Sequence, residues 1–225
     1  MNIHRFKFAD HAAQFDEHIM SSIPGLRRLR SECVMLSQRF IQGGTTVIDV
    51  GCSTGQFLAG VRDHNAAFHQ DVEYVGIDIE AKFSAHWQLL EKPDLHFQVA
   101  DVRTLPLEGL SFASGLFTLQ FLPEKDKRPV LKKIHAGLVT GGALVIAEKV
   151  LASSARLQDA LVPPYYDFKR ECFSSDEILD KERALRGVMT CWSEDEIKDA
   201  LASIGFREIQ LFWSNFPFKA FVAVK

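Results

Sequence analysis

The sequence has no run of about eighteen apolar residues, which is the length that a membrane-spanning helix needs. The first residues, MNIHRFKFADHAAQFDEH, are too polar to form the apolar core of a signal peptide. The net charge is only −3 at pH 7, so there is little electrostatic reason to expect a nucleic-acid partner. These absences predict a cytoplasmic protein that binds no membrane and whose partner is a small-molecule substrate.

Metal-binding and disulfide patterns are missing as well. The cysteines, Cys33, Cys52, Cys172 and Cys191, form no C-x-x-C pair, and the histidines show no H-E-x-x-H spacing. We therefore expect reduced thiols and no metal site. A chain of 225 residues can bury a sizeable core without such crosslinks. The eighteen phenylalanines provide enough apolar surface for a homodimer, although the sequence does not determine the oligomeric state.

Strand patterns alternate with helix patterns after a helical start. The expected strands cover 45–50, 72–79, 95–99, 113–119 and 143–149, and the expected helices cover 26–40, 56–63, 81–90, 125–138 and 193–204. Residues 206–225 show two further strand patterns around a turn at Ser214 and Asn215, which predicts an antiparallel hairpin. The alternation predicts an α/β, Rossmann-like fold with a mostly parallel seven-stranded sheet.

We expect one domain, 1–225, made of four parts. These are a helical N-terminal lid (1–44), a cofactor-binding core (45–150), a helical insertion over the active site (151–192), and a terminal helix with the hairpin (193–225). In the insertion, Pro163 and Pro164 are expected to break a helix, because proline removes a backbone hydrogen bond. The break would place Tyr165 and Tyr166 on a loop.

The segment VIDVGCSTG (47–55) joins the first strand to the next helix. Its glycines, Gly51 and Gly55, lie four residues apart, whereas a dinucleotide-binding loop has the pattern G-x-G-x-x-G. No Gly-Lys-Ser/Thr follows, so a phosphate-binding P-loop is excluded too. A ligand without phosphate is therefore favoured at the carboxyl end of this strand.

Carboxylates stand at the ends of three successive strands. Asp49 precedes Gly51 and suits an ammonium group, while Asp78 can accept hydrogen bonds from both ribose hydroxyls. Asp101 and the backbone of Val102 can hold adenine. A cationic ligand rich in hydroxyls and lacking phosphate matches S-adenosylmethionine (SAM). The pattern resembles the class I SAM-dependent methyltransferases, with a C-terminal hairpin as that superfamily has.

Longer segments resemble the carboxy-S-adenosylmethionine synthases within that superfamily. They are FDEHIMSSIPGL (15–26), DVGCSTG (49–55), FTLQFLPE (117–124), GLVTGGALVIAEK (137–149), YYDFKR (165–170) and the C-terminal GFREIQLFWSNFPFKAFVAVK. That family converts SAM and prephenate into carboxy-SAM, so the resemblance implies this activity. It also implies cofactor contacts from Gly51, Cys52, Ser53, Asp78, Ile79, Asp101 and Val102.

The sequence departs from that family at positions of the ligand pocket. Leu26 replaces a tyrosine, Leu116 replaces an asparagine, and Glu182 replaces an arginine. Arg183 lies one residue further on, which turns it by about 100° on a helix. The loss of an arginine that binds a carboxylate in bidentate fashion removes a strong polar contact.

Two family histidines are also replaced, by Tyr165 and Tyr166. With Phe117 they are candidates for stabilising the SAM sulfonium through cation–π contacts of ~0.5–2 kcal/mol each. With no second substrate, the nearest nucleophile is the amine of SAM itself, whose attack on the γ-carbon gives azetidine-2-carboxylate and methylthioadenosine. That amine must be neutral, which a dry pocket favours and a direct pair with Asp49 opposes.

Three alternatives to this cyclisation stay open. The first is carboxy-SAM synthesis from prephenate, with the displaced Arg183 as the cation for the carboxylate. The second is methyl transfer to a small acceptor, and the third is a SAM-binding subunit without catalysis.

Overall fold

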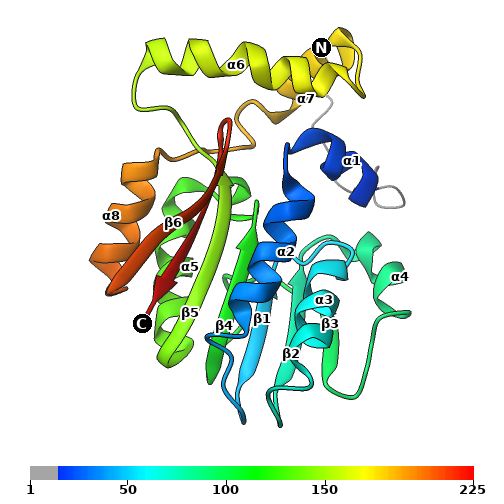
Figure 1. The fold of residues 1–225 in the computed structure, drawn as a ribbon, viewed down its shortest axis with the longest axis vertical. Helices are drawn as coiled ribbons and strands as arrows, with labels where there is room; N and C mark the ends of the chain where they lie inside the picture. Colours follow the sequence, from blue (N-terminus) through cyan, green and yellow to red (C-terminus); the bar gives the residue numbers. More distant parts are fainter. Residues whose placement is uncertain (1–14) are drawn as a thin grey trace.

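The computed structural model describes residues 15–225, and residues 1–14 of the expected lid lie outside this range. A seven-stranded sheet occupies the centre of the molecule in the order β3-β2-β1-β4-β5-β7-β6 (Figure 1). Its strands are β1 Thr46–Val50, β2 Glu73–Asp78, β3 Leu95–Val99, β4 Leu110–Leu116, β5 Leu138–Lys149, β6 Glu208–Asn215 and β7 Phe218–Val224. Strands β1 to β5 pair in parallel, whereas β7 is antiparallel to both β5 and β6. The predicted sheet and its C-terminal hairpin are thereby confirmed.

Helices lie on both faces of the sheet and across the carboxyl ends of its strands (Figure 1). They are α1 Phe15–Ser22, α2 Leu26–Ser37, α3 Gln56–Asn65, α4 Ser84–Trp87, α5 Glu124–Gly137, α6 Ala155–Arg170, α7 Ser175–Leu185 and α8 Glu194–Ile204, with short 3₁₀ helices η2 Ala81–Phe83 and η3 Leu119–Phe121. Helices α2 and α3 pack together on one face, and α5 and α8 pack together on the other. The capping box of Ser193 and Glu196 opens α8 as its sequence predicts.

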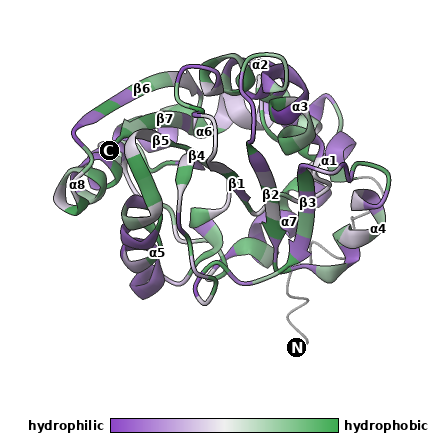
Figure 2. Ribbon diagram, turned by 90° about the horizontal axis from the view of Figure 1, so that it is seen from below, coloured by the Kyte–Doolittle hydropathy of each residue, from purple (hydrophilic) through white to green (hydrophobic). Residues whose placement is uncertain are grey.

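Two hydrophobic cores follow from the period-2 alternation of the strands. In β1, Val47 packs in the core of α2 and α3, whereas Ile48 packs in the core of α5 and α8. In β5, Val145 and Ile146 divide between the same two cores. In Figure 2, hydrophobic residues recur along the central strands, and the helices around them alternate hydrophobic with hydrophilic residues. Burial on both faces explains why these strands are nearly continuous apolar runs.

Several boundaries differ from the predicted ones: β5 begins at Leu138 instead of 143, and the helix expected over 81–90 is η2 followed by α4. Two further differences follow from local backbone conformation. The fourth strand covers Leu110–Leu116 instead of 113–119, because Phe117 has a φ of 62° and ends the extended chain. The hairpin turn lies at Phe216 and Pro217, not at Ser214 and Asn215. Phe216 has a positive φ of 49°, which supplies the reversal.

The predicted break in the insertion is wrong, because α6 runs without interruption through Pro163 and Pro164. Ser154 caps its first turn by accepting a hydrogen bond from the Leu157 backbone N–H. Beyond the prolines, Tyr165 is buried and its hydroxyl donates a hydrogen bond of 3.1 Å to the Ser22 carbonyl. This tertiary anchoring offsets the lost backbone hydrogen bonds, so the helix continues.

Candidate functional site

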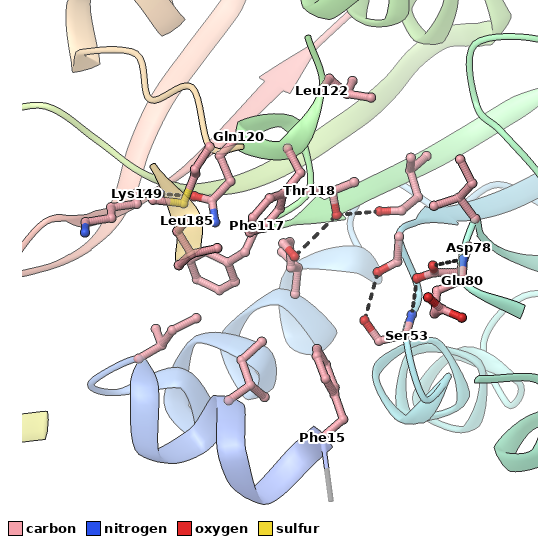
Figure 3. Close-up of a pocket in the computed structure, with 18 of the residues that line it drawn as sticks. Phe15, Ser53, Asp78, Glu80, Phe117, Thr118, Gln120, Leu122, Lys149 and Leu185 are labelled. Carbon is pink, nitrogen blue, oxygen red and sulfur yellow. Dashed lines mark hydrogen bonds between the residues drawn. The ribbon is translucent and has the colours of Figure 1, made fainter. Parts of the chain in front are cut away.

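A cavity of about 450 Å³ opens at the carboxyl ends of β1, β2 and β4, beneath α1, α6 and α7. The strand order reverses between β1 and β4, which is where ligands bind in sheets of this kind. The predicted site residues that line this cavity are Gly51, Ser53, Asp78, Ile79, Asp101, Val102, Leu116, Phe117 and Tyr165. Figure 3 shows Ser53 and Asp78 on one side of Phe117 and Lys149 on the other. Their roles as ligand contacts stay predictions.

The loop after β1 adopts a conformation that only its glycine suits. Gly51 has a φ of 75°, and its N–H donates a hydrogen bond of 2.8 Å to the Ile77 carbonyl of β2. A Cβ atom at this position would lie 2.4 Å from the Thr118 hydroxyl oxygen. That hydroxyl donates a hydrogen bond of 2.9 Å to the Val50 carbonyl, so two loops meet without space between them. The backbone is therefore brought to the edge of the cavity.

Asp78 connects the loop after β1 to the loop after β2. Its carboxylate accepts hydrogen bonds of 2.9 Å from the backbone N–H groups of Ser53 and Glu80. Burial raises the pKa of Asp78, and these two N–H groups oppose that shift. Each carboxylate oxygen keeps acceptor capacity, so Asp78 can also receive ligand hydroxyls.

Replacing Asp78 with alanine is expected to lower SAM affinity by at least tenfold, because both backbone N–H groups lose their acceptor. Isothermal titration calorimetry measures the change. The matched control is Glu73→Ala, which removes an exposed carboxylate at the opposite end of β2. Equal affinities for the two variants would contradict the role of Asp78.

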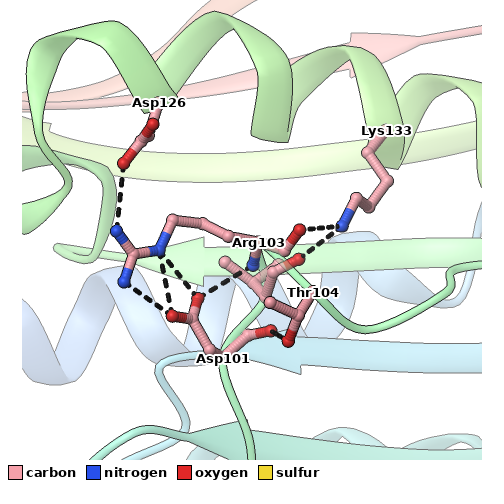
Figure 4. A network of polar contacts seen from close by, with 6 residues as sticks. Asp101, Arg103, Thr104, Asp126 and Lys133 are labelled. Carbon is pink, nitrogen blue, oxygen red and sulfur yellow. Dashed lines mark hydrogen bonds and ion pairs between the residues drawn. The ribbon is translucent and has the colours of Figure 1, made fainter.

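Asp101 belongs to a polar network that the sequence pattern does not reveal (Figure 4). The Arg103 guanidinium donates to both of its carboxylate oxygens and lowers the pKa of Asp101. Arg103 also bonds to Asp126, and Lys133 donates to the carbonyls of Val102 and Arg103. These contacts hold the loop after β3 against α5, with Asp101 ionised at the cavity edge.

Asp49, which its place in the sequence suits to a ligand ammonium directly or through water, is not among the residues that line the cavity. Its side chain is buried within the sheet, where the Ser114 hydroxyl donates a hydrogen bond of 2.7 Å to it. Burial raises the pKa of Asp49 to about 7. The side chain lies beneath the loop because alternate residues of a strand point to opposite faces.

Cys52 and Gly55 are also absent from the cavity lining. Cys52 is buried in a small apolar cluster with Phe83 and Trp87. Gly55 precedes α3 with a φ of 81°, and a Cβ there would lie 2.6 Å from the Phe97 ring. Both residues therefore act in packing beneath the loop, which the motif alone does not distinguish from ligand contact.

The turn after β4 carries Phe117 and Thr118 into the cavity and is held by Glu148 of β5. The buried carboxylate of Glu148 accepts hydrogen bonds of 3.0 and 2.9 Å from the backbone N–H groups of Leu119 and Gln120. The Phe117 N–H donates to the Ala147 carbonyl of the same strand. Glu148 thus fixes a turn in which Phe117 adopts its positive φ.

Glu148 makes stability depend on pH. Burial raises the pKa of Glu148 to about 8, from an ordinary value of 4.5. A carboxyl whose pKa is raised on folding stabilises the protein below its unfolded pKa and loses that contribution as pH rises through the folded value. Asp49, with its raised pKa, acts in the same direction.

We expect the wild-type protein to lose stability between about pH 5 and pH 8, and the Glu148→Gln variant to lose less. At the acidic end the variant is less stable, because its amide nitrogen cannot accept from one of the two backbone N–H groups. Urea unfolding at several pH values measures the difference. If the stabilities of the wild type and of Glu148→Gln fell equally with rising pH, the raised pKa of Glu148 would be contradicted.

The chain is similar to several known proteins. A family model described as a methyltransferase domain matches residues 47–142. Carboxy-S-adenosyl-L-methionine synthase of Histophilus somni is 31% identical over 98% of this chain and 93% of its own length. The Shigella sonnei enzyme of the same name is 34% identical over 95% of this chain and 88% of its own. The chain belongs to the carboxy-S-adenosyl-L-methionine synthase family.

Solved structures show the same fold at lower identity. The complex with the Haloferax volcanii Trm112 methyltransferase activator matches with a TM-score of 0.67 and 17% identity, covering 98% of each chain. Human N-acetylserotonin methyltransferase, solved in complex with SAM, matches with a TM-score of 0.59 and 15% identity, over 89% of this chain and 53% of its own. The protein is therefore a SAM-dependent enzyme of the methyltransferase fold.

The two tyrosines of the predicted pair differ in their relation to the main cavity. Adjacent residues of a helix point about 100° apart, and of the two only Tyr165 lines the main cavity. Both line a second cavity of about 490 Å³ between α6, the hairpin and the start of α8. Lysine ammoniums lie 5.4 and 5.5 Å from the centre of the Tyr165 ring, from Lys149 and Lys169. These cations leave Phe117 as the better candidate for a contact with a sulfonium.

Arg183, a candidate site residue from the sequence, is not among the residues that line either cavity. Its side chain is 72% exposed and pairs with Asp180 on the outer side of α7. Glu182 faces inward instead and lines both cavities. The charge at the position of the family arginine is thus reversed. Arg183, one residue further along α7, points to the outer side of the helix and does not restore a positive charge to the cavity. Leu26 is buried away from the cavity lining.

The sequence reasoning missed the lysines of the site. Lys149, Lys169 and Lys181 line the main cavity, so the pocket is not simply dry and aromatic. All three occur in or beside the family-like segments, in the strings AEK, DFKR and DKER. The sequence shows these lysines, but their convergence at the cavity depends on how β5, α6 and α7 pack in the fold.

The part of the chain that the structure describes contains no helix long and apolar enough to cross a membrane. Within residues 15–225, no group of histidine, cysteine, aspartate or glutamate side chains is arranged to hold a metal ion.

Proposed function

We propose that the protein binds SAM in the main cavity and uses it as its sole substrate, closing the methionine part into azetidine-2-carboxylate. The observation that carries the proposal is the composition of the cavity beyond the strand tips. Its apolar lining includes Leu116, Phe117, Tyr165 and Phe218. Glu182 occupies the position of the family arginine. An apolar wall suits a sulfonium that reacts with a group of its own molecule.

In the proposed reaction the neutral amine of SAM attacks its own γ-carbon. A carbon–nitrogen bond forms while the bond between the γ-carbon and sulfur breaks, and sulfur takes the electron pair to give neutral methylthioadenosine. The product nitrogen remains protonated, and the proton lost by the starting ammonium goes to solvent. Holding the amine in line with the carbon–sulfur bond is the main contribution required of the protein.

The position of Asp49 supports this chemistry. A carboxylate beside the amine would favour the charged, non-nucleophilic form. Asp49 lies outside the cavity lining and bonds to Ser114. Apolar walls and nearby lysines both disfavour an ammonium ion, so the neutral amine is accessible.

The test is incubation of the purified protein with SAM alone, followed by mass spectrometry. Enzymatic cyclisation gives methylthioadenosine and azetidine-2-carboxylate in equal amounts. Spontaneous attack by the carboxylate gives homoserine lactone instead, so the two amino-acid products separate the enzyme from the background. Methylthioadenosine formation at the rate of the buffer control would overturn the proposal.

Carboxy-SAM synthesis is the second candidate, and the comparisons favour it because the named relatives carry that activity over nearly the whole chain. Adding prephenate to the same reaction would then give a SAM derivative of higher mass. Methyl transfer would instead yield S-adenosylhomocysteine only after a small acceptor is added. One assay with three product masses therefore separates the candidates.

A further inference from the structure

Three lysines from three separate elements converge on one end of the main cavity. Lys149 comes from the end of β5, Lys169 from α6 and Lys181 from α7. In Figure 3, Lys149 lies on the far side of Phe117 from Asp78. The cavity is therefore polar at both ends, with carboxylates at one and ammonium groups at the other.

Lys169 is the most deeply buried of the three. Only 4% of its surface is exposed, and its ammonium forms no ion pair or hydrogen bond with residues 15–225. This ammonium lies 5.5 Å from the centre of the Tyr165 ring. A buried lysine is costly unless something compensates its charge. The compensating group is expected in the cavity that Lys169 lines.

Within residues 15–225, the carboxylate that acts on Lys169 is that of Glu182, which opposes the lowering of the Lys169 pKa by burial. Lys181 contacts His18 and donates a hydrogen bond of 3.2 Å to the Ser22 hydroxyl. Burial, together with the charge of Lys169, lowers the pKa of Lys181 to about 8. Among the described residues of β5, α6 and α7 that line the cavity, three are lysines and one, Glu182, is a carboxylate. These elements therefore bring more lysines than carboxylates to the cavity.

We propose that Lys149, Lys169 and Lys181 form a carboxylate-binding site, which holds the carboxylate of the ligand while its adenosine lies near Asp78 and Asp101. The site uses lysines, because this chain has Glu182 at the position where the family has an arginine. This inference rests on the proposed binding of SAM. Binding of the methionine carboxylate would also keep that carboxylate from attacking the γ-carbon, leaving the amine as the nucleophile.

The test compares two ligands that share adenosine and a thioether. S-adenosylhomocysteine has the amino-acid carboxylate, and methylthioadenosine lacks it. We expect Lys169→Met to lower the affinity for S-adenosylhomocysteine at least tenfold and to leave that for methylthioadenosine within twofold. The matched control is Arg170→Met, which removes the neighbouring exposed cation that pairs with Asp167 outside the cavity. Titration calorimetry gives both affinities.

If the lysines bind a carboxylate of a second molecule instead, the assignment to the methionine carboxylate is overturned. Lys169→Met would then leave S-adenosylhomocysteine binding unchanged but abolish the binding of malonate to the protein already saturated with that ligand. Equal behaviour of Lys169→Met and Arg170→Met in both titrations would overturn the lysine site. Should Lys169→Met fail to fold, Lys181→Gln replaces it, because Lys181 is only partly buried.

The proposal and the function on which it rests fail in different ways. If methylthioadenosine does not bind the wild-type protein, the assignment of SAM itself is wrong. If it binds but the lysine variants change neither titration, only the carboxylate site is wrong. In the cyclisation assay, the site further predicts that Lys169→Met shifts the products from azetidine-2-carboxylate towards homoserine lactone.

Discussion

Gly51→Ala is expected to lower SAM affinity at least a hundredfold. The added methyl group would lie 2.4 Å from the Thr118 hydroxyl oxygen, and the φ of 75° is itself unfavourable for alanine. Relief requires either the loop after β1 or the turn after β4 to move, and both line the cavity. Titration calorimetry with SAM measures the loss, and circular dichroism checks that the variant remains folded.

Gly44→Ala provides a matched control for backbone strain. Gly44 has a similar φ of 72°, but no atom lies within 4 Å of the position of its added Cβ. The substitution should cost about 1–2 kcal/mol of folding free energy and leave SAM affinity within twofold. If both variants bind SAM equally well, the close contact between Gly51 and Thr118 does not shape the site.

Phe117→Leu is expected to weaken binding of the sulfonium without weakening binding of the neutral sulfide. The ring is buried, lines the cavity and packs edge-to-face with Phe218 at 5.7 Å. Within residues 15–225 it makes no cation–π contact with a lysine or arginine. A cation–π contact of ~0.5–2 kcal/mol predicts a loss of about two- to thirtyfold in SAM affinity. The affinity for S-adenosylhomocysteine should stay within twofold.

The control for this prediction is Phe83→Leu. Phe83 also lines the cavity, but it packs with Cys52 and Trp87 away from Phe117. Its substitution should change the affinities for SAM and S-adenosylhomocysteine together, because it removes packing without regard to the ligand charge. A parallel loss for both ligands in Phe117→Leu would remove the proposed cation–π contact.

Local patterns in the sequence predicted the sheet because the strands are short, apolar and separated by helices with clear starts and ends. The loop after β1 was recognisable for the same reason, since Gly51 needs a positive φ and close backbone approach. Tertiary packing decided where the pattern was ambiguous. Asp49 and Asp78 both end strands in the sequence, but only Asp78 reaches the cavity.

The insertion shows the limit of local signals most clearly. Two prolines predict a break, yet the anchoring of Tyr165 to Ser22 keeps α6 continuous. That continuity turns Tyr166 away from the main cavity and brings Lys169 towards it. No pattern within α6 contains this information, because it depends on contacts with a helix more than a hundred residues earlier.

The sequence by itself determined the fold, the edge of the sheet at which the cavity opens, and the family. These depend on apolar periodicity and on a few short motifs. The tertiary structure decided which charges meet in the cavity: Glu182 in place of Arg183, and three lysines drawn from separate elements. The physical reason is that periodicity and backbone conformation act over a few residues. Electrostatic environment is instead a sum over side chains that only the folded chain brings together.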